Sequence, residues 1–301
     1  MSKDQLRDIS QEEVATFAKE GVVLLKNAFG QSWVDTLSEG LQKHRQSPTQ
    51  RARRWYKDEA GRSMFWDSQA WQSVPEYQDF IYHSHAAAIA GALTKASRIN
   101  FFFDAVFVRA PGTQFTTPWH QDEPYWSVEG YDTLTLWMPL VPVKKENALA
   151  FVPGSHRSDS VFYQYNFGSL NPDDKQDVDQ SDFANVGQVD IPDIDADPAA
   201  YNVTSWDMQP GDCVAFNSRI IHGGSGKLAE DTGLSVFTSK WLGDDARIKF
   251  RECGMDPDHT ECMLAAGLKE GDRPGTDLYP CLLYTSPSPR DQRGSRMPSS
   301  A

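Results

Sequence analysis

The chain has 301 residues, of which 39% are hydrophobic and 12% aromatic, and its formal net charge is −13. This apolar content can fill the core of one large domain or two small ones, which excludes a wholly disordered chain. The negative charge argues against nucleic acid and anionic membranes as partners, because both attract basic surfaces. The sequence has no apolar run long enough to span a membrane and no apolar leader, so we expect a soluble cytoplasmic protein. The cysteines lack C-x-x-C spacing and are too few for a disulfide scaffold, which favours a reducing compartment: Cys213, Cys253, Cys262 and Cys281.

Helical patterns dominate the N-terminal part of the chain. Ser10 is a suitable N-cap before a run with acidic residues in its first turn, and Gly21 ends that run. A short strand is expected next at "VVLLKNAF", residues 22–29. Two further amphipathic helices are predicted, over residues 31–46 and over the alanine-rich residues 78–96.

From residue 100 onward the pattern changes to short β-rich runs bounded by Gly, Pro, Asn and Asp. These runs are residues 100–112, 133–143, 148–156, 211–224 and 234–245. Helices followed by many strands indicate a mostly β fold, in which flanking helices pack on an antiparallel barrel or sandwich and no βαβ unit is present.

Three segments have an unusual composition. Residues 158–203 contain ten aspartates and one lysine, which predicts a long surface insertion. Residues 43–62 are basic, and the segment is either a solvated surface or a contact for an anionic part of a substrate. Residues 281–301 are rich in Ser, Pro and Arg and resemble translated adaptor sequence, so the native domain is predicted to cover residues 1–280. A natural disordered tail is the alternative.

The stretch "TPWHQDEPYW" places two metal-ligand types, His120 and Asp122, two residues apart. A reactive Fe(II) centre needs neutral imidazoles, a carboxylate and open positions, which two histidines and one carboxylate provide. Side chains at i and i+2 of an extended segment point the same way, so His120 and Asp122 can share one metal. The pair alone is also compatible with an ordinary hydrogen-bonded turn.

The second histidine of such a site must come from elsewhere in the chain, which contains seven histidines. His222 is the best candidate by position, because it ends the strand pattern of residues 211–224 and is followed by two glycines. Glycines allow the backbone to approach a metal or ligand closely.

Four blocks together resemble the phytanoyl-CoA dioxygenase family: "FVRAPGTQFTTPWHQDEPYW", "LWMPLVPVKKENALAFVPGSH", "SWDMQPGDCVAFNSRIIHGG" and "KWLGDDAR". The resemblance implies a double-stranded β-helix, a jelly-roll or cupin-like barrel, that uses Fe(II), 2-oxoglutarate and O2. It also implies that His120, Asp122 and His222 bind the iron. Trp126 and Trp137 resemble pocket-lining aromatics, with core packing as the alternative, while Gln114 and Thr117 are placed near the site by their proximity to the motif. Glu146, Asn147 and Asp212 are interpreted as turn-forming residues.

The sequence departs from the family pattern at one position. The family binds the distal carboxylate of 2-oxoglutarate with an arginine shortly after the second histidine, but residues 233–235 are Gly-Leu-Ser. Lys240 is the first candidate to replace it, with help from Ser235 or Thr238, and Arg219 and Lys227 are weaker candidates. A different keto acid, or a relative without turnover, would also explain the difference.

The sequence therefore predicts a dioxygenase that hydroxylates an aliphatic C–H bond of a small organic substrate. Retention of Asp122 favours hydroxylation over halogenation. The alternatives are a catalytically silent metal- or ligand-binding member of the family and, more distantly, a cupin-like isomerase or storage protein. The sequence leaves the substrate and the oligomeric state open.

Overall fold

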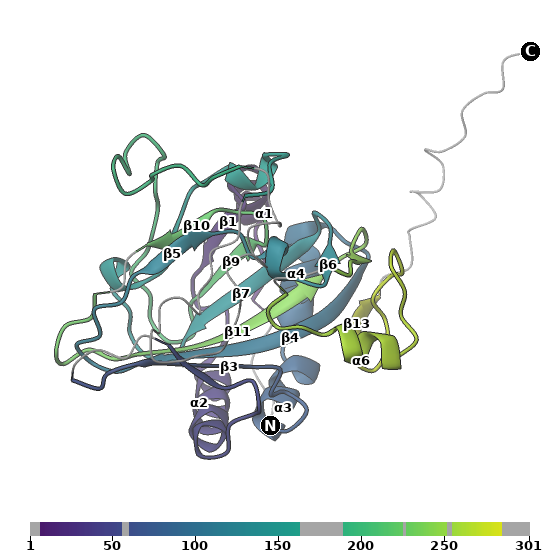
Figure 1. Ribbon diagram of the computed structural model, residues 1–301, viewed down its shortest axis with the longest axis horizontal. Coiled ribbons are helices and arrows are strands. Elements are labelled where there is room, and N and C mark those ends of the chain that lie inside the picture. Colours follow the sequence, from purple (N-terminus) through teal and green to yellow (C-terminus); the bar gives the residue numbers. More distant parts are fainter. Residues whose placement is uncertain (1–6, 56–59, 163–188, 225–226, 252–254, 285–301) are drawn as a thin grey trace, which may run out of the picture.

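The computed structural model describes residues 7–55, 60–162, 189–224, 227–251 and 255–284 (Figure 1). Its helices are α1 (Gln11–Glu20), α2 (Gln31–Gln46), α3 (Pro75–His83), α4 (Ala86–Thr94) and α6 (Thr260–Ala265), with short 3-10 helices η1 (Glu123–Tyr125), η2 (Lys145–Asn147) and η3 (Ser155–Arg157). Its strands are β1 (Val22–Leu25), β2 (Arg53–Trp55), β3 (Met64–Ser68), β4 (Arg98–Arg109), β5 (Thr117–His120), β6 (Val128–Glu129), β7 (Thr133–Pro139), β8 (Ala150–Phe151), β9 (Cys213–Asn217), β10 (His222–Gly224), β11 (Leu234–Leu242), β12 (Arg247–Ile248) and β13 (Cys281–Tyr284).

Two antiparallel sheets of unequal size form the barrel. In the described part of the chain, the major sheet has eight strands in the order β1-β9-β7-β11-β4-β3-β2, with β13 pairing beside β4. The minor sheet has the order β5-β10-β8. Figure 1 shows β5 and β10 above the long strands β7, β11 and β4, with α2 and α3 below them. This arrangement confirms the predicted mostly β fold with flanking helices.

Alternate side chains of β11 point to opposite faces of the major sheet, so this strand contributes to two layers of the fold. Phe237 and Trp241 belong to the core that the sheet shares with the helices, and both are fully buried. Val236 and Thr238 point to the opposite face, where they line a cavity between the sheets. Because both faces are covered, nearly every residue of β11 is buried.

Helix boundaries follow the expected capping chemistry in α1 but not in the alanine-rich region. Ser10 and Glu13 form a reciprocal capping box, and Gly21 ends α1 with a left-handed backbone. The single helix predicted over residues 78–96 is wrong, because the chain forms α3 and α4 separately. The helix is interrupted at Ser84, whose backbone is extended (φ −78°, ψ 172°) and whose hydroxyl accepts from the amide of Ala86.

Two of the predicted strand segments divide or shorten in the structure. The segment 211–224 forms β9 in the major sheet and β10 in the minor sheet, because the chain turns at residues 218–221 between them. The segment 148–156 contributes only the short strand β8 before a turn that continues into η3. The chain therefore crosses from the major sheet to the minor sheet within the segment 211–224.

The C-terminal boundary predicted at residue 281 falls inside the sheet. β13 pairs with β4, and Leu282 and Leu283 pack against the main core. Because β3 pairs only with residues 105–109 of β4, the other end of this edge of β4 offers backbone groups that β13 can pair with. Residues 285–301 lie outside the described residues.

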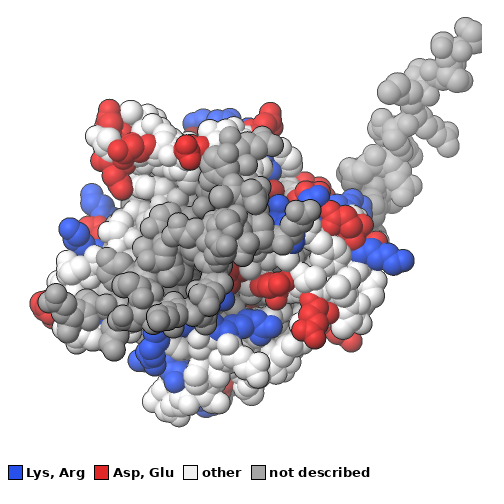
Figure 2. Space-filling model, viewed as in Figure 1, with Lys and Arg blue, Asp and Glu red and all other residues white. Residues whose placement is uncertain are grey.

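The Asp-rich segment is described only at its two ends, since residues 163–188 lie outside the described residues. Residues 189–203 contact the minor sheet, where the indole of Trp119 donates to Asp195 at 3.0 Å. Ile194 packs with Val152 and Ile221 in a small apolar cluster. Figure 2 shows acidic side chains gathered at the upper left, where residues 189–203 lie.

Candidate metal centre

The two histidines of the candidate site are direct register partners on neighbouring strands. His120 is the last residue of β5 and His222 the first residue of β10, and the two are paired across the minor sheet. Their ring centroids lie 4.2 Å apart. Cross-strand neighbours project from the same face of a sheet, so this register brings the two imidazoles together although the residues are far apart in sequence.

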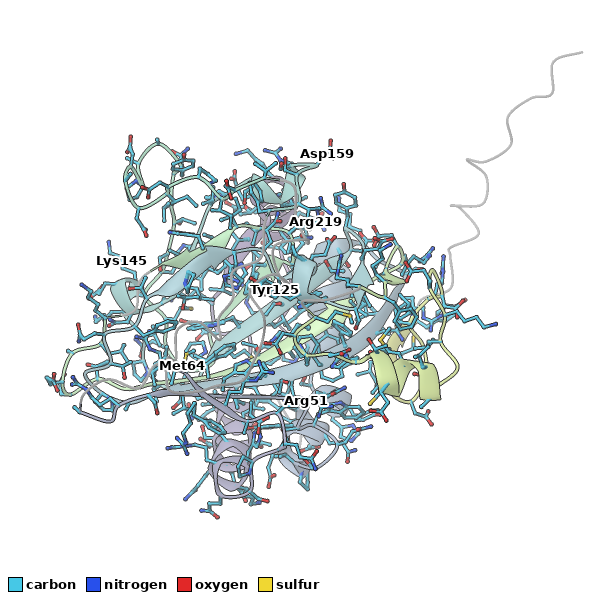
Figure 3. The ribbon with its side chains drawn as sticks, viewed as in Figure 1. Arg51, Met64, Tyr125, Lys145, Asp159 and Arg219 are labelled. Atoms are coloured by element: carbon cyan, nitrogen blue, oxygen red, sulfur yellow. The ribbon has the colours of Figure 1, made fainter. Side chains whose placement is uncertain are left out.

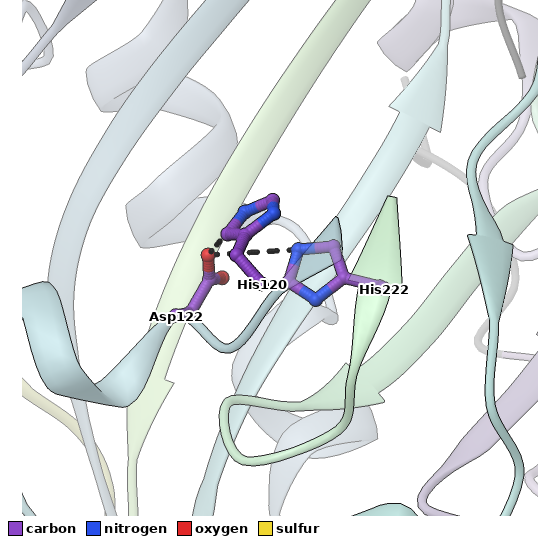
Figure 4. Close-up of side chains that lie close together, drawn as sticks. All are labelled: His120, Asp122 and His222. Atoms are coloured by element: carbon purple, nitrogen blue, oxygen red, sulfur yellow. Dashed lines mark ion pairs between the residues drawn. The ribbon is translucent and has the colours of Figure 1, made fainter. Parts of the chain in front are cut away.

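Asp122 completes the group (Figure 4). Its Oδ1 atom lies 3.6 Å from Nε2 of His120 and 3.6 Å from Nε2 of His222. One ligand atom from each of the three residues lies within 4.8 Å of the others. The backbone of Asp122 is helical (φ −76°, ψ −42°), and the residue immediately precedes η1. The expected reason for the convergence, an extended segment with i and i+2 aligned, is therefore wrong: β5 ends at His120 and the turn into η1 aims the carboxylate.

Backbone carbonyls orient both imidazoles. Nδ1 of His120 lies 2.8 Å from the carbonyl of Pro118, and Nδ1 of His222 lies 3.1 Å from the carbonyl of Ile220. A carbonyl can only accept, so each Nδ1 carries the proton and donates. Nε2 is then the lone-pair nitrogen in each ring, and it faces Asp122. This is the tautomer that a metal requires.

Hydrogen bonds hold both the backbone and the carboxylate of Asp122 in place. The amides of Asp122 and Glu123 both donate to the carbonyl of Ser218, at 2.9 Å and 3.0 Å. The hydroxyl of Thr135 on β7 donates to Oδ2 of Asp122 at 3.3 Å. Ser218 lies in the connection between β9 and β10, so the segments that carry Asp122 and His222 are joined directly. Such supporting bonds fix the geometry of a metal site.

The ionisation states at the site suit a divalent cation. Burial raises the pKa of Asp122, but the charges of His222, His120 and Lys240 outweigh burial and bring the pKa down to about 2. Burial lowers the pKa of His222 to about 4, and repulsion from His120 adds to this effect. At neutral pH the site therefore offers an ionised carboxylate and an uncharged imidazole of His222, as metal coordination demands.

Gly223 allows the two strands to approach each other closely. A Cβ atom at this position would lie 2.7 Å from the carbonyl oxygen of Pro118 and 2.8 Å from Cα of Trp119. Both contacts are with the backbone of the neighbouring strand, so a side chain would require the strands to separate. The glycine that follows His222 therefore has a packing reason.

A mostly apolar cavity extends from the three residues into the space between the sheets. In Figure 3, Met64 on β3 and Tyr125 in η1 mark the lower and upper sides of this space, and both residues line the cavity. Of the residues predicted from the sequence, Thr117, Trp126, Trp137 and Lys240 also line it. Buried aromatic rings make the cavity walls mostly apolar.

Two predicted co-substrate residues are not among those that line the cavity. Ser235 belongs to the alternate face of β11, since Leu234 and Val236 point inward. The side-chain amide of Gln114 donates to the carbonyls of Gly112 and Leu228 and ties two loops together. Ser235 therefore points away from the cavity because side chains alternate along β11, and Gln114 is held away from it by its hydrogen bonds to the two loops.

The two weaker cation candidates are placed elsewhere. Arg219 contacts both carboxylate oxygens of Glu123 at 3.2 Å and lies over the ring of Tyr131, with Cζ 4.5 Å from the centroid. Lys227 is exposed, and its carbonyl accepts from Asn147. Of these candidates, Lys240 is the one found among the described lining residues.

Sequence reasoning missed Arg109, which lines the cavity from β4. It also interpreted Asn147 as structural, whereas this residue lies at the cavity wall. A signal for Arg109 was present, since it continues the alternate row of Phe103, Ala105 and Phe107, which also face the cavity. Asp212 does shape its turn, because its carboxylate accepts from the amides of Asn27 and Gln209.

The basic segment 43–62 is partly neutralised where the structure describes it. Arg53 pairs with Asp256 at 2.8 Å, and Arg62 pairs with Glu230 at 2.8 Å. Asp256 itself lines the cavity, so Arg53 lies near the cavity rim. The described surface in Figure 2 otherwise shows basic and acidic side chains interspersed.

The facing sheets and the three clustered ligands define a cupin-like barrel with a candidate metal centre. The phytanoyl-CoA dioxygenase family model matches residues 17–231, and the chain belongs to this family. The resemblance stated from the sequence blocks is thereby confirmed. No curated protein sequence matches the chain.

Solved structures show the same fold at low sequence identity. The non-heme alpha ketoglutarate dependent carbocyclase SnoK from nogalamycin biosynthesis is 19% identical, with a TM-score of 0.66 and coverage of 91% of this chain and 97% of that chain. The epimerase SnoN in complex with Fe3+, alpha ketoglutarate and nogalamycin RO is 20% identical, with a TM-score of 0.65 and coverage of 90% and 98%. EctD from S. alaskensis with 2-oxoglutarate and 5-hydroxyectoine is 15% identical, with a TM-score of 0.60 and coverage of 82% of each chain. At these identities the likeness shows the fold alone.

Within the described ranges, no helix combines the length and apolar character needed to cross a lipid bilayer.

Proposed function

We propose that the chain is an Fe(II)- and 2-oxoglutarate-dependent dioxygenase that hydroxylates an aliphatic C–H bond of a small organic substrate. The observation that carries the proposal is the convergence of His120, Asp122 and His222 at a mostly apolar cavity. Two histidines and one carboxylate are typical of non-haem iron(II) oxygenases. Family membership supports this proposal, as do structural relatives bound to Fe3+ and alpha ketoglutarate or to 2-oxoglutarate.

The donor set fits ferrous iron. His120 and His222 would bind it through Nε2, since each Nδ1 donates to a backbone carbonyl, and Asp122 would bind it through its carboxylate. When bound, iron supplies the activation of O2 that couples oxidation of 2-oxoglutarate to succinate with oxidation of the substrate. Retention of the Asp122 carboxylate supports hydroxylation over halogenation.

The protein's own contribution is to position the substrate and to exclude water. Trp126 and Trp137 line the cavity and are only 2% and 5% exposed. Together with Tyr125 and Phe103 they offer aromatic surface to an aliphatic substrate. The cavity therefore favours a substrate with an apolar part that reaches the metal ligands.

The test is anaerobic addition of Fe(II) and then 2-oxoglutarate to the purified protein. We expect a weak visible charge-transfer band, followed by formation of succinate when O2 is admitted. His222→Ala should lose both signals, while His83→Ala should keep them, because His83 is an exposed histidine with 68% side-chain exposure. Neither band nor succinate from the folded protein would refute the proposal.

The second candidate is a catalytically silent, ligand-binding member of the family, and the absence of arginine at residues 233–235 is the observation that favours it. That protein would still bind Fe(II) at the three ligands, but it would give neither the charge-transfer band nor succinate, because both require bound 2-oxoglutarate. Product analysis also separates hydroxylation from other oxidative outcomes, since the structural relatives include a carbocyclase and an epimerase.

A further inference from the structure

Two basic side chains, Arg109 and Lys240, occur among the described residues that line the cavity. Each residue is only 5% exposed. Burial lowers the pKa of Arg109 to about 10 and the pKa of Lys240 to about 8. Arg109 therefore remains charged at neutral pH at the wall of a mostly apolar cavity, and a guanidinium is a suitable partner for an anionic ligand group.

These two cations lie at opposite ends of one strand pair. Arg109 is the register partner of Leu234 at the start of β11, whereas Lys240 lies six residues further along β11. Six residues of extended strand correspond to roughly 20 Å. The two side chains therefore mark different positions along the cavity.

Lys240 belongs to the end that holds the candidate metal ligands. Its register partner on β7 is Thr135, whose hydroxyl donates to Asp122. The ammonium group of Lys240 donates to the hydroxyl of Thr238, and its charge acts on Asp122 and His222. The contacts of Lys240 are therefore those of a residue that supports the metal end of the cavity.

Arg109 is held in a fixed orientation by the loop that follows β4. Its Nη2 atom donates to the carbonyl of Phe115 at 2.6 Å and to that of Thr113 at 3.4 Å. The loop is anchored in turn, because the amide of Leu228 donates to Thr113 at 2.8 Å. A guanidinium fixed in this way loses little conformational freedom on binding, and its planar group of donors matches the two oxygens of a carboxylate.

We infer that Arg109, and not Lys240, binds the distal carboxylate of the keto-acid co-substrate. The inference rests on the proposed function, because it assumes that a 2-oxo dicarboxylic acid enters this cavity. The 2-oxo acid end of such a molecule belongs at the metal ligands, which leaves its other carboxylate to a cation away from them. Arg109 is that cation among the described lining residues.

The test is anaerobic titration calorimetry of the Mn(II)-loaded protein with 2-oxoglutarate and with 2-oxopentanoate, which has the same chain length but no distal carboxylate. Arg109→Leu should weaken 2-oxoglutarate binding roughly 30- to 100-fold, the effect of losing a paired, charge-assisted contact. Binding of 2-oxopentanoate should change by no more than about threefold, because it never makes that contact. Lys240→Met is the matched control and should leave the ratio of the two affinities within about threefold of the unsubstituted protein.

Arg109→Lys is a second variant, since leucine removes the bonds to the loop. It keeps the charge but not the paired donors, so the affinity ratio should fall by about tenfold. An unchanged ratio in both Arg109 variants, or a ratio abolished by Lys240→Met, would overturn the inference. If the metal-loaded unsubstituted protein binds no 2-oxoglutarate at all, the proposed function fails and the inference falls with it.

Discussion

At the scale of single residues, the carbonyls of Pro118 and Ile220 determine which nitrogen of each imidazole faces Asp122. Neither group is a side chain, so this control cannot be removed by substitution. The hydroxyl of Thr135 is different, because it supports the carboxylate through one hydrogen bond of 3.3 Å from a neighbouring strand. It offers a direct way to test the support of the site.

Thr135→Val should weaken Fe(II) binding by about tenfold while preserving the fold, since the loss of an outer hydrogen bond typically costs 10- to 100-fold in metal affinity. Anaerobic competition with a chelator measures the affinity, and circular dichroism checks the fold. Thr94→Val is the control, because that hydroxyl donates to Ala90 within α4. Equal metal affinities for all three proteins would show that Thr135 does not support Asp122.

His259 is a buried histidine outside the candidate metal site. It is fully shielded, its Nδ1 atom lies 3.0 Å from the hydroxyl of Tyr279, and its ring packs against Phe102 and Phe103. Burial, with a further contribution from the charge of Arg51, lowers the pKa of His259 to about 3. The unfolded chain binds this proton near pH 6.5, so the native state is progressively disfavoured as the pH falls from about 6.5 toward 3.

We therefore expect His259 to contribute a slope of up to about 1.4 kcal/mol per pH unit to the free energy of unfolding in this window. His259→Asn, which keeps a polar group but does not titrate, should flatten the dependence between pH 6.5 and 4.5. Urea unfolding in the presence of EDTA measures it, with the exposed His83→Asn as control. The assignment is wrong if both variants retain the slope of the unsubstituted protein.

At the scale of elements, the connection between β9 and β10 joins the two sheets and carries an ion pair that is largely shielded from solvent. The side chains of Arg219 and Glu123 are 11% and 10% exposed, and Arg219 also donates to the carbonyl of Ser158. Burial raises the pKa of Glu123, although the charge of Arg219 opposes this shift. Removing one partner would leave the other charge in a poorly solvated position.

Arg219→Met should lower the free energy of unfolding by about 3 kcal/mol. Glu123→Gln combined with Arg219→Met should cost less than the two single changes together, because no unpaired charge remains. Urea denaturation of the four proteins gives the coupling energy. Glu230→Gln is the control at an exposed pair (82% exposure) and should cost less than about 1 kcal/mol. Strict additivity at 123 and 219 would contradict this account.

The elements also show what local sequence patterns can predict. Ser10 and Gly21 bound α1 as expected, because capping depends on a few neighbouring residues. The break between α3 and α4 was missed, since alanine-rich sequence favours helix on both sides of Ser84. The alternation of Phe103, Ala105 and Phe107 along β4 indicates the inward face of Arg109, but its position opposite Leu234 depends on the register of β4 with β11, which is a long-range property.

At the scale of the whole molecule, the order of helices before strands predicted the layers, because each layer must bury one face against another. The family motifs marked His120, Asp122 and His222, and the structure brings these three residues together. The pairing of His120 with His222 could not be derived from spacing alone, since it depends on how β10 leaves the major sheet to join β5.

This arrangement predicts that metal binding stabilises the entire barrel, because a ligand that binds only the native state shifts the unfolding equilibrium. A metal concentration about 100 times the dissociation constant contributes roughly 2.7 kcal/mol, which corresponds to an increase in Tm of about 5–10 °C. Differential scanning fluorimetry with EDTA and then excess Mn(II) measures the shift. His222→Ala should show no response, and an equal response in that variant would place the bound metal elsewhere.

Gly223 affects both the packing of two strands and the position of a metal ligand. A methyl group at this position fits only if the backbone of β10 moves outward, and the imidazole at 222 is attached to that same backbone. The gap between the nitrogen donors is therefore governed by a residue that has no donor atom of its own. The affinity for a particular ion would then depend on how closely β5 and β10 approach each other as much as on the identity of the three ligands.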